Sequence, residues 1–150
     1  MKMIDLGVTQ FLSGMALGVD MWAAQMVVAL RKRGHKVRLI CVLPCETQAD
    51  KWAEEYRECY FQLLENADEV LYTNTRYSST CMYERNKYLA LHTDYLLAVY
   101  DGVSKGGTAK TVRFAENRGI PVTVIHPNTL LVTSTREQKT TQKASVITFF

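Results

Sequence analysis

Residues 11–44 read "FLSGMALGVDMWAAQMVVALRKRGHKVRLICVLP": an apolar run of strand length, a glycine-containing turn, a helical segment and a second apolar run. Apolar side chains recur every three or four positions in the helical segment, at Val19, Trp22, Ala23, Met26, Val27 and Leu30. Gly34 is typical of the end of a helix, and Pro44 ends the second apolar run. This order predicts two parallel strands joined by a helix, the unit of an α/β sheet.

The same alternation continues along the chain. Apolar runs predict further strands at 69–72, 95–100 and 121–125, and helices are expected at about 82–92 and 108–118. One more helix is expected to begin at a Thr47 cap and to turn inward Trp52, Tyr56, Tyr60 and Leu63. We therefore predict a Rossmann-like, three-layer, doubly wound α/β fold with a mostly parallel sheet.

The regular alternation stops near Asn128. We expect residues 1–128 to form one Rossmann-like domain and residues 129–150 to be a C-terminal tail. In that tail, "TSTREQKTTQKAS" is typical of a solvated surface segment, and the final "VITFF" is either an edge strand or simply the end of the chain.

Composition indicates a soluble globular domain, because 47% of the 150 residues are hydrophobic and 22% are charged. The sequence shows no membrane-spanning run and no signal-peptide pattern, so we expect a cytoplasmic location and no membrane partner. A net charge of +3 gives little support to a nucleic-acid partner. The four cysteines form no CxxC pair and the three histidines lie far apart, so we predict no metal site and expect free thiols.

Two glycine-rich segments fall where ligands bind in such folds, outside the carboxyl ends of the parallel strands. "SGMALGVD" (13–20) and "DGVSKGGT" (101–108) each precede a helix, whose unpaired N–H groups favour phosphate. Either segment alone is typical of a turn, and Asp20 and Asp101 are equally typical of caps. Together they favour a phosphorylated nucleotide as ligand, although neither has the GxGxxG or Walker A spacing of a classical cofactor site.

Four motifs resemble one known family, the YpsA-type group of the SLOG superfamily. They are, in order, "SGMALGVDMWAAQ", "VLPCETQADKW", "CMYERNKYLALHTDYLLAVYDG" and "GGTAKTVRFA". The resemblance runs from about Asp5 to His126. It implies a relationship to the DNA-processing protein DprA (Smf) and to the Lonely Guy phosphoribohydrolases.

The resemblance also implies a pocket for a nucleotide or nucleotide derivative, with a role in sensing such ligands. Carried over motif by motif, the residues that would line it are Ser13, Gly14, Leu17, Gly18, Asp20, Arg85, Asn86, Asp101, Gly102, Gly106, Gly107 and Thr108.

The beginning of the chain departs from the family pattern. Members of the group usually start with another strand and a "GHR"-like loop, whereas this chain starts at the end of the helix that follows. The chain is then a naturally short member or a fragment, and one wall of the pocket is missing or comes from another subunit. We expect a homo-oligomer, because an unpaired sheet edge or apolar surface would otherwise be exposed.

A second departure concerns catalysis. The Lonely Guy enzymes carry a glutamate just after their "GGxGT" loop, where this chain has Lys110 and Thr111. The leading hypothesis is therefore a binding protein. An N-glycosidic hydrolase of nucleoside phosphates is the first alternative, and a single-stranded DNA-binding module is the second.

Overall fold

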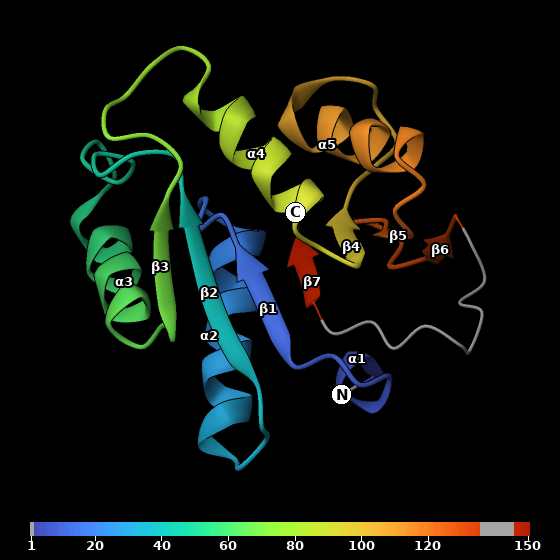
Figure 1. The fold of residues 1–150 in the computed structure, drawn as a ribbon, viewed down its shortest axis with the longest axis horizontal. Helices are drawn as coiled ribbons and strands as arrows, with labels where there is room; N and C mark the ends of the chain where they lie inside the picture. Colours follow the sequence, from blue (N-terminus) through green and yellow to red (C-terminus); the bar gives the residue numbers. More distant parts are fainter. Residues whose placement is uncertain (1, 136–145) are drawn as a thin grey trace.

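In the part of the chain that the structure describes, seven strands form one sheet in the order β3-β2-β1-β7-β4-β5-β6 (Figure 1). This computed structural model describes residues 2–135 and 146–150, so most of the segment expected to be a solvated surface tail, residues 136–145, lies outside the described residues. The strands are β1 (Gln10–Ser13), β2 (Arg38–Leu43), β3 (Glu69–Tyr72), β4 (Tyr95–Val99), β5 (Val122–Ile125), β6 (Val132–Ser134) and β7 (Val146–Phe149). The helices are α1 (Lys2–Asp5), α2 (Val19–Lys32), α3 (Glu54–Glu65), α4 (Cys81–Leu91) and α5 (Gly106–Asn117).

The predicted fold class is confirmed, because five of the six neighbouring strand pairs are parallel. The exception is β6, which pairs antiparallel with β5 at one edge of the sheet. All carboxyl ends of the parallel strands therefore lie along the same rim. In the described part of the chain, no helix has the length and apolar content that crossing a membrane requires.

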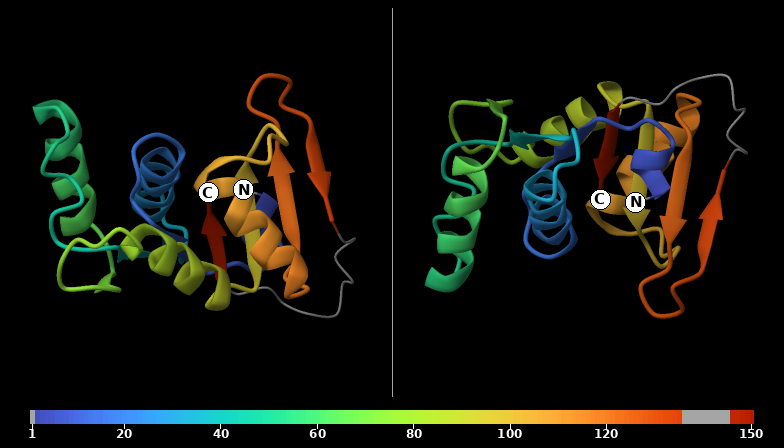
Figure 2. Two further views of the ribbon diagram at one scale, coloured as in Figure 1. Left: turned by 90° about the horizontal axis from the view of Figure 1, so that it is seen from above. Right: turned by 90° about the horizontal axis from the view of Figure 1, so that it is seen from below.

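The helices cover both faces of the sheet, with α2 and α3 on one side and α4 and α5 on the other (Figure 2). Successive strand residues point to opposite faces, so Phe11 and Leu39 belong to the core under α2 and α3. Their neighbours Leu12 and Ile40 belong to the core under α4 and α5. Burial on both faces explains why these strands are nearly continuous apolar runs.

The C-terminal strand β7 lies in the middle of the sheet, which corrects the expectation that "VITFF" is an edge strand. It pairs in parallel with β1 on one side and with β4 on the other. Ile147 and Thr148 are fully buried there. Because β7 lies between β1 and β4, each of these two strands is paired on both sides, and the expected homo-oligomer is not supported by an unpaired edge there.

The buried face of α2 differs from the stripe that the sequence indicates. Met21, Ala24 and Val28 face the core, whereas Trp22 and Met26 are 67% and 64% exposed. The apolar residues of α2 form two adjacent stripes, and a helix can turn only one of them to the sheet. The second stripe is therefore left on the surface.

The helix after β2 begins at Glu54, later than expected, and Thr47 does not cap it. Residues 47–52 instead form successive turns, with hydrogen bonds from Asp50 N to Thr47 O and from Trp52 N to Ala49 O. Tyr60 and Leu63 face inward as expected, but Tyr56 is 49% exposed. The turns keep this segment at the carboxyl rim, where the site described below is built.

Candidate functional site

Arg85, in the second turn of α4, is the most buried charged side chain at the carboxyl rim, with 3% of its surface exposed. Its Nη1 donates a hydrogen bond to the carbonyl oxygen of Gly14, in the turn after β1. Its Nε donates to Oδ1 of Asn86 at 2.7 Å. Burial lowers the pKa of Arg85, and the negative charge of Asp20 opposes that effect. Arg85 thus ties α4 to the first glycine turn.

Gly14 is glycine because Arg85 lies against it. A Cβ atom at position 14 would stand 2.6 Å from Cζ of Arg85, well inside the van der Waals distance. The backbone of Gly14 approaches a side chain of the same protein, so this glycine is explained without a ligand.

Gln48 holds the same turn from the side of β2, and sequence reasoning missed it. Its Nε2 donates to the carbonyl oxygens of Gly14 at 3.2 Å and Met15 at 2.8 Å. Its Oε1 is buried and accepts no hydrogen bond from the described residues. The residue stands inside "VLPCETQADKW", but only the tertiary structure brings it to Gly14.

Ser13 and Asp20 close the first turn from within. Ser13 Oγ donates to the carbonyl oxygen of Asp20 at 3.1 Å and accepts from Met15 N at 3.1 Å. Asp20 Oδ2 accepts from Ala16 N at 3.3 Å. Burial raises the pKa of Asp20 to about 6, although the charge of Arg85 and the Ala16 N–H lower it. Both residues act on the turn itself.

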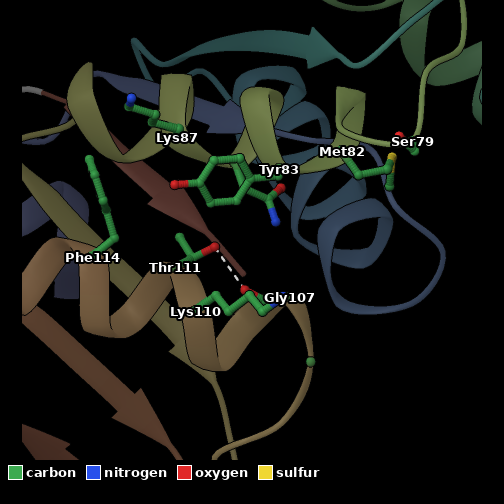
Figure 3. Close-up of a pocket in the computed structure, with 10 residues that line it drawn as sticks. Ser79, Met82, Tyr83, Lys87, Gly107, Lys110, Thr111 and Phe114 are labelled. Carbon is green, nitrogen blue, oxygen red and sulfur yellow. Dashed lines mark hydrogen bonds between the residues drawn. The ribbon is translucent and has the colours of Figure 1, made fainter.

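A cavity of about 270 Å³ lies between α4 and α5 (Figure 3). It joins the beginning of α5 to the exposed side of α4 and combines cationic, aromatic and amide groups. Thr111 Oγ1 donates to Gly107 O at 2.9 Å along its floor. The described residues that line it are Ser79, Met82, Tyr83, Asn86, Lys87, Gly106, Gly107, Lys110, Thr111 and Phe114.

The twelve residues predicted to line one pocket do not lie together in one place. Asn86, Gly106 and Gly107 line the α4–α5 cavity. Leu17 and Gly18 line a separate groove of about 650 Å³ between α2 and α3. The other seven are not among the described lining residues of either. Four of them are buried in the rim: Ser13, Gly14, Asp20 and Arg85. Asp101 and Gly102 lie in the loop before α5, where Asp101 Oδ1 accepts from Val103 N at 2.9 Å, and Thr108 lies in the first turn of α5.

The sequence did not predict Tyr83, Lys87 or Phe114 as site residues, and Lys110 and Thr111 were considered only because they stand where the Lonely Guy enzymes have a glutamate. The spacing of these residues could have indicated them. Tyr83 and Lys87 are four residues apart on α4, and Gly107, Lys110, Thr111 and Phe114 are three to four apart on α5, so each set forms one helix face. Which faces meet depends on how the two helices pack, and the sequence does not contain that information locally.

Comparison with known proteins relates the chain to a bacterial family. Residues 1–130 match the YspA SLOG family. A UPF0398 protein of Halalkalibacterium halodurans is 32% identical over 120 residues, which are 79% of this chain and 64% of that protein. A UPF0398 protein of Brevibacillus brevis is 33% identical over 92 residues, 60% of this chain and 49% of that protein.

A further relative is the SPbeta prophage-derived protein YoqJ of Bacillus subtilis. It is 29% identical over 133 residues, which are 79% of this chain and 77% of that protein. Against the two UPF0398 proteins, the chain spans only about half to two thirds of the relative's length.

Proposed function

The chain belongs to the YspA SLOG family, and from this premise we propose that it binds a phosphorylated nucleotide or nucleotide derivative between α4 and α5. The observation that carries the proposal is the α4–α5 cavity, which reaches the beginning of α5 and is lined by two lysines and two aromatic rings from the two helices. Such a set suits a ligand with a phosphate at one end and a flat base at the other.

The phosphate would bind where α5 begins. The first N–H groups of a helix have no partner within the helix, and its dipole favours an anion there. The cap residue of α5, Lys105, makes no capping hydrogen bond with its side chain. Lys110, one turn further along α5, brings a positive charge to the same cavity, and Lys87 brings another from α4.

The base would bind against Tyr83 and Phe114. Both rings line the cavity, one from each helix (Figure 3). Stacking on an aromatic ring contributes roughly 1–3 kcal/mol per base. A cavity of about 270 Å³ lies just below the usual range of about 300–1,000 Å³ for small-molecule sites, which favours one nucleotide over a dinucleotide.

We propose binding rather than hydrolysis, because none of the described lining residues is acidic. Lys110 and Thr111 line the cavity where a phosphoribohydrolase would need a carboxylate. Incubation with nucleoside monophosphates should release no free base above the protein-free control, as measured by chromatography. Release that scales with protein concentration would favour the hydrolase instead.

The binding proposal is tested by titrating the protein with a panel of nucleotides and following thermal unfolding, because a ligand that binds the folded state raises its stability. Lys110→Ala should lower the affinity for the most tightly bound nucleotide by about tenfold, because the loss of one charge-assisted contact costs about 1.4 kcal/mol. Lys32→Ala, an exposed lysine of the last turn of α2, is the matched control and should bind normally. No stabilisation by any nucleotide would contradict the proposal, and so would equal binding by the two variants.

A further inference from the structure

We propose that Asn86 selects the ligand of the α4–α5 cavity, because Arg85 holds its amide so that only a hydrogen-bond donor faces the ligand. The ligand group recognised there would be an acceptor without protons, such as an ionised phosphate. This inference rests on the proposed function and deepens it.

The orientation of the Asn86 amide follows from chemistry. A guanidinium carries five N–H donors and no acceptor, so the Asn86 atom that meets Arg85 Nε must be the carbonyl oxygen. That contact is 2.7 Å long. Arg85 itself cannot turn freely, because it is buried and also donates to the carbonyl oxygen of Gly14. Rotating the amide would set N–H against N–H, so the Asn86 amide has one orientation.

The NH2 group of Asn86 consequently points away from Arg85 and toward α5. Nδ2 lies 3.4 Å from where a Cβ of Gly107 would stand, at the beginning of α5. Asn86 lines the cavity, and within the described part of the chain no hydrogen bond from Nδ2 is found. An unused donor therefore lies beside the unpaired N–H groups of the helix.

Several of the groups that line the same cavity are donors or cations. Asn86 Nδ2, the first N–H groups of α5 and the ammonium of Lys110 can all donate hydrogen bonds to an oxyanion. A phosphate oxygen can accept from each of them, whereas a hydroxyl or an amide would place its own protons against some of them. The site thus favours the phosphate group over the nucleoside that carries it.

The decisive variant is Asn86→Asp. It keeps the shape of the side chain and gives Arg85 a carboxylate oxygen in place of the amide oxygen, so the fold should be retained and its melting temperature unchanged or raised. The second oxygen replaces Nδ2 and sets a negative charge against the phosphate. Asn86→Ala is the comparison, because it leaves Arg85 without this partner and should lower the melting temperature.

The probes are adenosine 5′-monophosphate, adenosine and inorganic phosphate, titrated by calorimetry against wild type and Asn86→Asp. In wild type we expect the monophosphate to bind more tightly than adenosine. In the variant we expect its affinity to fall by at least about tenfold, while that of adenosine stays within about twofold. The ratio of the two affinities is a readout that a purely structural role of Asn86 would not change.

The outcomes separate the two proposals. If wild type binds none of the probes and no nucleotide of the panel, the proposed function is wrong. If wild type prefers the monophosphate and Asn86→Asp keeps the same ratio, the function stands and the role of Asn86 is overturned.

Should Asn86→Asp fail to fold, ¹⁵N NMR of the wild-type protein gives the answer. The side-chain NH2 signals of Asn86 should shift on titration with inorganic phosphate. Signals that stay in place at saturation would overturn the inference.

Discussion

Arg85 lies directly against Gly14 at the carboxyl rim, in space that a side chain at position 14 would occupy. The guanidinium is buried and donates hydrogen bonds to the carbonyl oxygen of Gly14 and to Asn86. Packing therefore requires glycine at position 14. Because this glycine leaves room for Arg85, it indirectly orients the Asn86 amide that Arg85 holds.

We expect Gly14→Ala to lower the free energy of unfolding by about 1–3 kcal/mol, the usual effect of an added methyl group in a packed interior. Gly107→Ala is the control, because a Cβ there meets only Asn86 Nδ2 at 3.4 Å and its backbone is not left-handed. Urea unfolding of both variants measures the difference. Equal losses at the two positions would show that Gly14 is not constrained by Arg85.

The raised pKa of Asp20 predicts a pH dependence of stability. Its pKa is about 6 in the folded protein against an ordinary value of 3.8, so the folded state binds the proton more tightly. The stability that protonated Asp20 contributes is fully present below pH 3.8 and is lost as the pH rises through about 6. The shift corresponds to about 3 kcal/mol.

Relative to Asp20→Asn, the wild-type protein should therefore lose about 2–3 kcal/mol of unfolding free energy between pH 4 and pH 7. Comparing the two proteins removes the contributions of other titrating groups. Urea unfolding at several pH values gives both curves, and curves that run parallel would contradict the assignment.

Among the elements, β7 occupies the central position of the sheet, between β1 and β4. It has a neighbouring strand on each side, and its residue Ile147 has none of its surface exposed. The edge strand β6 has the opposite character, since Val132 is 60% exposed. These two short C-terminal strands should respond very differently to the same kind of substitution.

We expect Ile147→Ala to reduce the free energy of unfolding by about 2–5 kcal/mol, because it removes buried methyl groups and leaves a cavity. Val132→Ala should change it by less than about 0.5 kcal/mol. Chemical denaturation of the two variants decides the matter. A small effect at Ile147 would mean that β7 is not part of the central sheet in solution.

At the scale of the whole molecule, several large apolar side chains on α2 and α3 are left outside the cores. Trp22 and Tyr56 line the groove between these helices, and Met26 lies one turn beyond Trp22. This surface is the second apolar stripe of α2 together with the outer side of α3. An exposed apolar surface of this kind favours self-association.

We expect the protein to self-associate, and Trp22→Arg to weaken that association by at least about tenfold, because it sets a charge in an apolar contact. Sedimentation velocity over a range of concentrations measures both proteins. Lys32→Ala, elsewhere on α2, serves as the control and should associate like wild type. A wild-type monomer at the highest concentration would contradict the prediction.

The sequence determined the features that depend on local spacing. Apolar runs of strand length between helical segments are enough to predict a parallel sheet with two helical layers, because both faces of such a sheet must be buried. Glycine-rich segments before α2 and α5 placed the expected site on the carboxyl rim, and Asn86, Gly106 and Gly107 do line a cavity there.

The tertiary structure decided everything that depends on contacts between distant residues. Arg85 and Gly14 are 71 positions apart in the sequence, and only the folded chain shows that Arg85 occupies the space beside Gly14. The central position of β7 depends on its pairing with β1 and β4, because an apolar run of four residues is compatible with an edge or a centre alike. The α4–α5 cavity likewise exists only because two particular helix faces meet, and a local pattern specifies a face without its partner.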